Sequence, residues 1–179
     1  MKKMINLLVV SLLALSLFGC SSNDEPEVTP TPEVTPETEV TPEVEEPSVS
    51  TGMLAVYDAM IADYTDVMPA LEVVGIDVAA DAFGLTSEYY SELVWAMPLM
   101  NVHATIIVIA EATDGNLENV KAEIDNYFEG YEESWATYLP EQYDLVVARQ
   151  TAEVGNMYVV VVSEYAEDMV AILTNAGSK

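Results

Sequence analysis

The sequence has one cysteine, one histidine and only five basic residues among its 179. A single cysteine cannot form a disulfide within the chain, so any folded part must be held together by its hydrophobic core. The basic residues stand against 31 acidic ones, and the formal net charge is −26. Such a charge opposes binding to nucleic acid and favours cations or basic partners, although acidity also serves simply to keep a domain soluble.

Motifs of the common catalytic and cofactor-binding classes are also missing. The sequence contains no Gly-x-Ser-x-Gly elbow, no Ser-x-x-Lys pair, no phosphate-binding loop and no dinucleotide-binding glycine pattern. We therefore expect no cofactor, and no residue is assigned a catalytic role from a motif.

The N-terminus is organised like an export signal. Two lysines precede an apolar run over residues 5–18, which is too short to span a bilayer comfortably. The run ends in Leu17-Phe18-Gly19-Cys20, which resembles the cleavage motif of bacterial lipoproteins, with Phe18 bulkier than is usual at its position. The resemblance implies that residues 1–19 are removed and that Cys20 carries two acyl chains. Two chains are physically reasonable, since a single chain holds a protein to a membrane only marginally. An ordinary secretory signal or an uncleaved anchor is the alternative.

Residues 20–50 differ in composition from the rest of the chain. Six of the nine prolines fall here, interleaved with Glu, Thr and Val, and the phrase Thr-Pro-Glu-Val occurs twice. Without aromatic residues or a periodic apolar face, this segment cannot bury enough surface to offset the entropy of ordering it. We predict a disordered, extended tether that reaches on the order of 90 Å at about 3.1 Å per residue.

Residues 51–179 carry the periodic patterns of one small α+β domain. The patterns predict helices over 53–68, from about 116 to before Pro140, and over 166–175, with an irregular Ala-rich stretch over 71–85. They predict strands over 90–97, 103–112, 145–153 and 157–164, the last two joined by a turn at Gly155-Asn156. We expect a four-stranded, largely antiparallel sheet in the order α-ββ-α-ββ-α, with helices packed on one face.

Three stretches of this domain resemble a known family. The run from Val102 to Val108, the long acidic helix and the strand over 158–162 are similar to the domain of unknown function 4358 family. The resemblance covers roughly residues 70–175. It implies a Gram-positive lipoprotein with a Pro/Glu/Thr-rich tether and one such domain, and it transfers no catalytic residue.

Two polar positions are candidates for chemistry. His103, as a general base, would need a nucleophile or carboxylate brought to it by the fold; at the start of a central strand, a partly buried, hydrogen-bonded histidine is more typical. Asp114, Asn116 and Glu118 alternate as in a calcium loop, but Asn119 stands where that loop needs glycine. A turn followed by a helix cap explains these residues, so we assign no metal site.

The acidic and aromatic residues of the long helix permit two interpretations each. Glu132, Glu133 and Glu141 could supply a carboxylate pair for glycoside hydrolysis, or belong to a solvated helix face. Their aromatic neighbours could form a platform for a sugar or peptide, although their spacing is typical of the buried side of a helix; they are Tyr127, Tyr131, Trp135 and Tyr138. We expect Trp95 and Tyr158, on strands, to lie in the core.

These observations favour a lipoprotein anchored at the outer face of the cytoplasmic membrane. We expect its domain to be a non-catalytic binding or scaffolding module for an envelope protein or a wall component. A hydrolase acting on wall polymer or peptide is the alternative, and a passive acidic surface element is a third. A deep cleft joining His103 to two carboxylates would favour the enzyme, and a filled sheet with an exposed apolar patch would favour binding.

Overall fold

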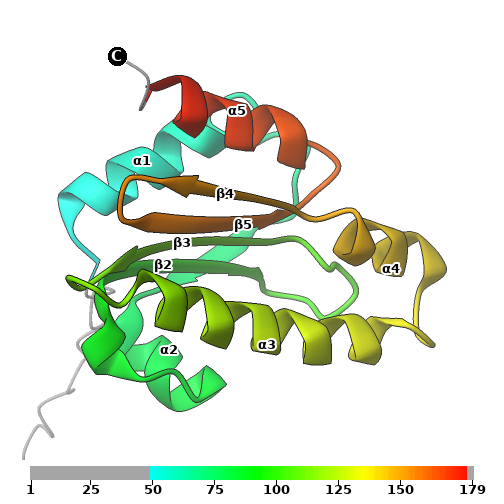
Figure 1. Ribbon diagram of the computed structural model, residues 1–179. Helices are drawn as coiled ribbons and strands as arrows, with labels where there is room; N and C mark the ends of the chain where they lie inside the picture. The colour runs from blue at the N-terminus through cyan, green and yellow to red at the C-terminus, as the bar shows by residue number, and fades with distance from the viewer. Residues whose placement is uncertain (1–48, 177–179) are drawn as a thin grey trace, which may run out of the picture. The chain divides into compact units, whose positions relative to one another are not determined.

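Strand β3, Ile106–Ala112, is the centre of the fold in the computed structural model, which describes residues 49–176. It pairs on one side with β2, Tyr90–Pro98, and on the other with β5, Met157–Val162. The edge strands are β1, Leu71–Val74, and β4, Gln150–Val154. All neighbours are antiparallel, and the sheet has the order β1-β2-β3-β5-β4 (Figure 1).

The predicted signal and lipidation residues are not among those described. Leu17, Phe18, Gly19 and Cys20 lie outside the range, as does the predicted tether up to residue 48. Within residues 49–176, no helix combines the length and the apolar character needed to cross a membrane.

The prediction of four strands was wrong, because the stretch over 71–85 begins with a strand. Leu71–Val74 pairs with residues 95–98 of β2. Four residues are too few to show the alternation that distinguishes a strand, and this one obtains its ladder from a segment distant in sequence. Helix α2, Ile76–Phe83, follows directly and is closed by Gly84, whose φ of +71° is the left-handed conformation favoured at helix ends. A 3₁₀ turn, Ser87–Tyr89, leads into β2.

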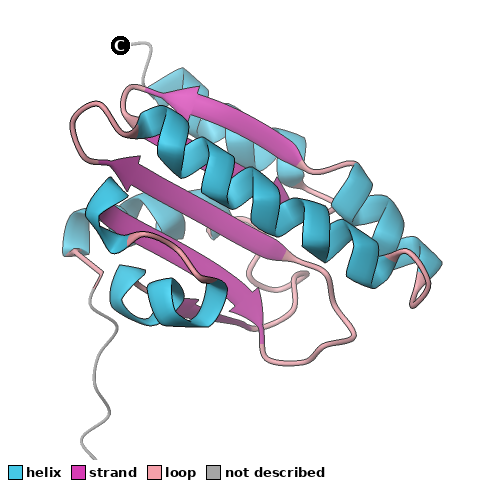
Figure 2. Cartoon of the chain, turned by 60° about the horizontal axis from the view of Figure 1, so that its bottom comes forward, coloured by secondary structure: helices cyan, strands magenta, loops and turns pink. Residues whose placement is uncertain are grey.

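Helices cover both faces of the sheet, whereas we predicted them on one. Helices α2, α3 (Leu117–Trp135) and α4 (Pro140–Val147) pack on one face, and α1 (Thr51–Ile61) and α5 (Ala166–Ala176) pack on the other (Figures 1 and 2). The middle strands require this arrangement. Val94 belongs to the core under α1 and α5 while Trp95 belongs to the core under α3, and both are fully buried. Strands without polar alternation are buried on two faces.

The first helix begins where predicted but ends early. Ser50 caps it by accepting a hydrogen bond from the backbone N–H of Met53 at 3.1 Å. It stops at Ile61 instead of Met68, and turns follow up to Met68. Residues 62–68 include Asp and Thr, which are poor helix formers, and they end directly before Pro69, which disfavours the helical conformation of the residue before it. The apolar stripe alone does not extend the helix through this segment.

The segment before β4 is helical, not extended as predicted. Helix α3 ends at Trp135, ahead of Pro140 as expected, but Pro140 then occupies the first turn of a new helix that continues to Val147. Proline is favoured at that position because its missing N–H would be unsatisfied there anyway. The strand therefore starts at Gln150, and the predicted turn at Gly155-Asn156 joins it to β5.

The larger of the two cores is rich in aromatic residues. Trp95 and Phe128 are fully buried under α3, and Tyr158 is buried beside them, so Trp95 and Tyr158 are core residues as expected. Among the described residues, the indole N–H of Trp95 is the one buried side-chain polar atom without a hydrogen-bond partner. The ring of Tyr127 meets the indole edge to face, at 89° and 4.7 Å between centroids. Within residues 49–176, the core under α1 and α5 has Tyr57 as its one buried aromatic residue and is otherwise aliphatic and methionine-rich.

The two ends of the sheet carry different connections. The strand register brings residues 62–70, 99–105 and 163–165 to one end, and the end of α3 brings residues 136–139 to the same place; we call it the loop end. The opposite end holds the β4–β5 turn and the start of α1, where the Ser50 hydroxyl donates a hydrogen bond to Glu92. The chain therefore enters the domain at the end farthest from the loop end.

Candidate functional site

His103 lies on the loop between β2 and β3 and borders two pockets at the loop end. Its side chain is half-buried, as expected for a residue near the start of a central strand. Within residues 49–176, however, no hydrogen bond or ion pair involves its imidazole. The loop is held from the neighbouring helix, because Gln142 Oε1 of α4 accepts a hydrogen bond from the backbone N–H of Ala104 at 2.8 Å.

The first pocket, which we call the apolar pocket, has a volume of about 430 Å³ and lies on the α3 side of the loop. Its walls are mostly the ends of β2 and α3, and apart from His103 no titratable side chain other than tyrosine lines it. The residues that line it are Met97, Pro98, Leu99, Asn101, His103, Ile106, Tyr131, Ser134, Trp135 and Tyr138.

The predicted aromatic platform is divided between the core and this pocket. Tyr127 packs in the core, while Tyr131 and Trp135 form the pocket wall, with ring centroids 6.0 Å apart. Tyr138 stands 5.5 Å further on and is 53% exposed. Burial raises the pKa of the Tyr131 phenol above its usual 10.0. Tyr127 and Trp135 therefore belong to the packed side of the helix, as one of the two interpretations had it. Tyr138, at the exposed end of the four aromatic residues, leaves aromatic surface open to a ligand.

The second pocket, which we call the acidic pocket, has a volume of about 420 Å³ and lies on the other side of the same loop. Asp66 and Glu164 are its exposed carboxylates, and neither pairs with a basic residue among those described. The other residues that line it are Val67, Met68, Pro69, His103, Thr105, Gln142, Leu145, Ser163 and Tyr165.

The polar groups of the acidic pocket are not assembled for nucleophilic catalysis. The Ser163 hydroxyl accepts a hydrogen bond from the backbone N–H of Tyr165 at 3.1 Å and lies 3.9 Å from the sulfur of Met68. A serine nucleophile needs a base within hydrogen-bonding reach. No hydrogen bond among the described residues joins His103 to Ser163, Asp66 or Glu164. The arrangement offers acceptors and an imidazole to a ligand, which suits binding.

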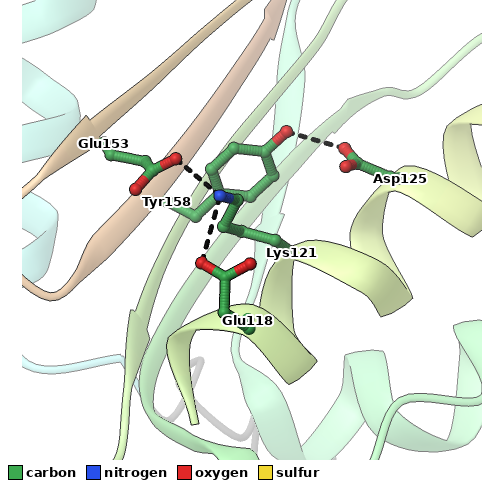
Figure 3. A network of polar contacts seen from close by, with 5 residues as sticks. All are labelled: Glu118, Lys121, Asp125, Glu153 and Tyr158. Carbon is green, nitrogen blue, oxygen red and sulfur yellow. Dashed lines mark hydrogen bonds and ion pairs between the residues drawn. The ribbon is translucent and has the colours of Figure 1, made fainter. Parts of the chain in front are cut away.

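Both basic residues of the described range are engaged inside the fold. Lys121 pairs with Glu118 at 3.2 Å and with Glu153 at 2.6 Å, next to a 2.6 Å hydrogen bond from Tyr158 to Asp125 (Figure 3). The hydrogen bonds to Glu153 and Glu118 raise the pKa of Lys121.

The second of these residues, Arg149, is also held by several partners. It pairs with Glu132 at 3.0 Å, donates to the carbonyl of Val146, and lies 5.7 Å from the Phe128 ring centroid. Neither Lys121 nor Arg149 lines the apolar or the acidic pocket, so the carboxylates at the loop end are not neutralised by them.

The calcium-like residues lie at the opposite end of the sheet. Asp114 is exposed beside Gly115, whose φ of +79° makes the turn. Asn116 occupies the N-cap position of α3, but its side chain bonds to Thr113 and Asn119 instead of to the helix N–H groups. Glu118 pairs with Lys121. Across the described part of the chain, no three His, Cys, Asp or Glu side chains are grouped to hold a metal ion.

The carboxylates proposed as a hydrolytic pair are only partly brought together. Glu132 and Glu133 border a shallow pocket of about 330 Å³ between α3 and Tyr143 of α4, together with Glu129, and Glu132 forms an ion pair with Arg149. Glu141 lies in the first turn of α4 and does not border it.

Sequence reasoning missed the residues that build the loop end. The patterns placed Asp66 in the helix predicted over 53–68 and Glu164 in the strand predicted over 157–164, and no motif marks either residue or Leu99. One signal was available: Leu99 and Met100 are an apolar pair directly after Pro98, where the chain must leave the sheet and polar turn residues are usual.

Comparison with known proteins gives a family without an assigned activity. No curated protein and no solved structure matches the chain. The model of one family, described as "Domain of unknown function (DUF4358)", matches residues 62–163, a range that includes β1 to β5 and most of the loop end. The chain belongs to this DUF4358 family.

Proposed function

We propose that this protein is an extracytoplasmic lipoprotein, anchored through Cys20, whose domain is a non-catalytic binding or scaffolding module of the cell envelope. The observation that carries the binding role is the apolar surface of the loop end. Seven large hydrophobic side chains of the described residues are exposed, and five of them are in the loop-end segments. These five, each 42% to 66% exposed, are Val67, Leu99, Met100, Val102 and Tyr138. Gathered exposed apolar residues mark interaction sites.

The position of the loop end suits a domain that is held from its N-terminal side. The described chain starts next to Glu92, at the opposite end of the sheet. The loop end is therefore distant from the point at which the described chain begins. The strong negative charge of the domain disfavours insertion of these apolar residues into anionic lipid, so a protein or wall component is the better occupant.

Lipidation is tested by metabolic labelling with a palmitate analogue in cells that express the full chain. We expect label on the wild type and none on Cys20→Ser, which should also be released from the membrane fraction. Equal labelling of both would remove the anchor from the proposal.

The binding role is tested by crosslinking in intact cells followed by mass spectrometry. We expect a reproducible envelope partner that is lost when residues 51–179 are deleted and the tether is kept. Leu99→Ser with Tyr138→Ser should reduce capture, whereas Val78→Ser with Val147→Ser should not, because the latter pair is similarly exposed but lines neither pocket. Capture equal to the tether-only control would contradict the role.

One observation keeps a hydrolase as the second candidate. The acidic pocket does join His103 to two carboxylates and to Ser163, although without the hydrogen bonds of a catalytic pair. If the protein cleaves wall polymer or peptide, purified wild type should release soluble fragments from cell-wall material. His103→Ala and Ser163→Ala should each stop that release.

A further inference from the structure

The two pockets of the loop end form one composite surface. They lie at the same end of the sheet on the two sides of the loop over residues 99–105, and His103 borders both. A ligand that crosses this loop can place one group in each pocket. The chemistry of the two pockets therefore specifies two neighbouring groups on a single ligand.

The lining of the apolar pocket suits an aromatic or branched aliphatic side chain. Its volume of about 430 Å³ exceeds what one such side chain fills, and its aromatic walls at Tyr131 and Trp135 are held in place by the core. Interfaces concentrate binding energy where an apolar anchor enters a pocket of this kind. Exposed Leu99 and Tyr138 stand at its mouth, where an incoming side chain would cover them.

The carboxylates of the acidic pocket suit a cationic group that donates hydrogen bonds. Asp66 and Glu164 supply carboxylates with no basic partner among the described residues. Thr105 is only 6% exposed and lines this pocket, and no hydrogen bond within residues 49–176 uses its hydroxyl. Ammonium and guanidinium groups satisfy such a set of acceptors.

A third carboxylate lies at the border of the apolar pocket. Glu72 of β1 is exposed and directly opposite Met97 of β2. Side chains of directly opposed residues share one face of a sheet, so Glu72 stands beside the pocket wall that Met97 contributes.

Charge decides among the possible occupants. Residues 49–176 contain 22 acidic and two basic residues, a formal charge of −20, so a second copy of the chain would be repelled. The chain's own segment over 20–48 contains nine acidic residues and no basic one, and it is disfavoured for the same reason. A basic partner is attracted to this charge.

We infer, resting on the binding role proposed above, that the loop end takes a cationic segment of an envelope protein. An apolar side chain of that segment occupies the apolar pocket, and an adjacent Lys or Arg enters the acidic pocket between Asp66 and Glu164. The loop with His103 lies beneath the backbone that joins them.

The test uses the full chain reconstituted in nanodiscs of zwitterionic lipid, with empty nanodiscs as the control for lipid binding. A random library of displayed twelve-residue peptides is selected on both. We expect enrichment of peptides with an aromatic or branched aliphatic residue close to Lys or Arg. No enrichment over empty nanodiscs, or enriched peptides without excess Lys and Arg, would overturn the inference.

Variants then locate the binding of one enriched peptide. Neutralising three exposed carboxylates should weaken it about 10- to 100-fold, since each exposed pair is worth about two- to fivefold. These substitutions are Asp66→Asn, Glu72→Gln and Glu164→Gln; the matched control with the same charge change away from both pockets is Asp58→Asn, Glu88→Gln and Asp114→Asn. Leu99→Ser with Tyr138→Ser should weaken binding about tenfold or more. Equal affinity for the loop-end and control variants would place the peptide elsewhere and refute the inference.

The two proposals fail in distinguishable ways. A partner captured in cells through the domain, combined with a failed peptide test, would keep the binding role and reject its cationic, two-pocket form. Absence of capture in cells together with a failed peptide test would reject both.

Discussion

Replacing Tyr90 by Phe removes a phenol that links the sheet to helix α3. The Tyr90 hydroxyl donates a hydrogen bond to the carboxylate of Glu123 at 2.9 Å, and the same carboxylate accepts the backbone N–H of Thr86. The Tyr90 side chain is buried. A hydrogen bond to a charged group contributes about 1.5–3 kcal/mol, so Tyr90→Phe should lower the free energy of unfolding by roughly that amount at pH 7.

The same substitution should change the pH dependence of stability. Burial, followed by the bond to and the charge of Glu123, raises the pKa of Tyr90 well above its usual 10.0. Burial is also the main cause that raises the pKa of Tyr127, and burial followed by the bond to Asp125 raises that of Tyr158. Below pH 10 these phenols are protonated in both states, and their contribution to stability is fully present. Above pH 10 the unfolded chain loses these protons while the folded chain keeps them, so that contribution is lost as pH rises.

The slope follows from proton linkage. Each phenol that stays protonated only in the folded state lowers the free energy of unfolding by about 1.4 kcal/mol per pH unit. Three such tyrosines give about 4 kcal/mol per unit above pH 10. Tyr90→Phe should reduce the wild-type slope by about 1.4 kcal/mol per pH unit, and the difference from wild type isolates this residue because all other groups titrate in both proteins.

Urea unfolding followed by tryptophan fluorescence between pH 8 and pH 11.5 measures the slope. Tyr138→Phe is the matched control for the loss of a phenol at pH 7: this side chain is 53% exposed, and its replacement should leave the free energy of unfolding at that pH within about 0.5 kcal/mol of wild type. A wild-type free energy of unfolding that stays level from pH 8 to 11.5, or equal slopes in wild type and Tyr90→Phe, would refute the reasoning.

Three further predictions concern the fold and the loop end. Phe128→Ala removes a fully buried ring that packs against Trp95 and Tyr127, and it should lower the free energy of unfolding by about 3–5 kcal/mol. The exposed Leu99→Ala is the control and should cost less than about 0.5 kcal/mol. Equal losses in a urea melt would contradict the packing. A Cβ has open space at both Gly84 and Gly130, so only the backbone conformation distinguishes the two positions. Gly84→Ala should lower the free energy of unfolding by about 1–2 kcal/mol because of its left-handed φ, whereas Gly130→Ala inside α3 should raise it by about 0.5–1 kcal/mol. Effects of the same sign in chemical denaturation would contradict this. Gln142→Leu deprives the buried N–H of Ala104 of its acceptor and should cost about 1–3 kcal/mol in a urea melt, while Gln142→Glu keeps an acceptor and should cost less; the reverse order would show that this bond does not hold the loop.

Local signals in the sequence predicted the elements whose information is contained within a few neighbouring residues. The central strand opens with four β-branched residues over 106–109, Ser50 caps the first helix, and the Gly155-Asn156 turn joins β4 to β5, all as expected. In the segment before β4, two local signals favoured different structures. Pro140 started a helix through a segment whose valines favoured a strand.

Packing on two faces was encoded in the sequence but was not recognised. Val94 and Trp95 are adjacent, apolar and both fully buried, so each must be covered by a different layer. A run of this kind, without polar alternation, is typical of a strand that is buried on both faces, and the prediction of helices on one face did not take this into account.

The sequence by itself determined the composition of this protein's parts: an acidic chain with an apolar N-terminal run, a proline-rich segment and the periodic patterns of one α+β domain. Only the tertiary structure decided that Asp66, Leu99, His103 and Glu164 meet at one end of the sheet. These residues come from three connecting segments, and their neighbourhood depends on strand register and on pairing across distant parts of the chain. Segment ends have no periodicity of their own, so the pattern that places them is carried by the strands they connect.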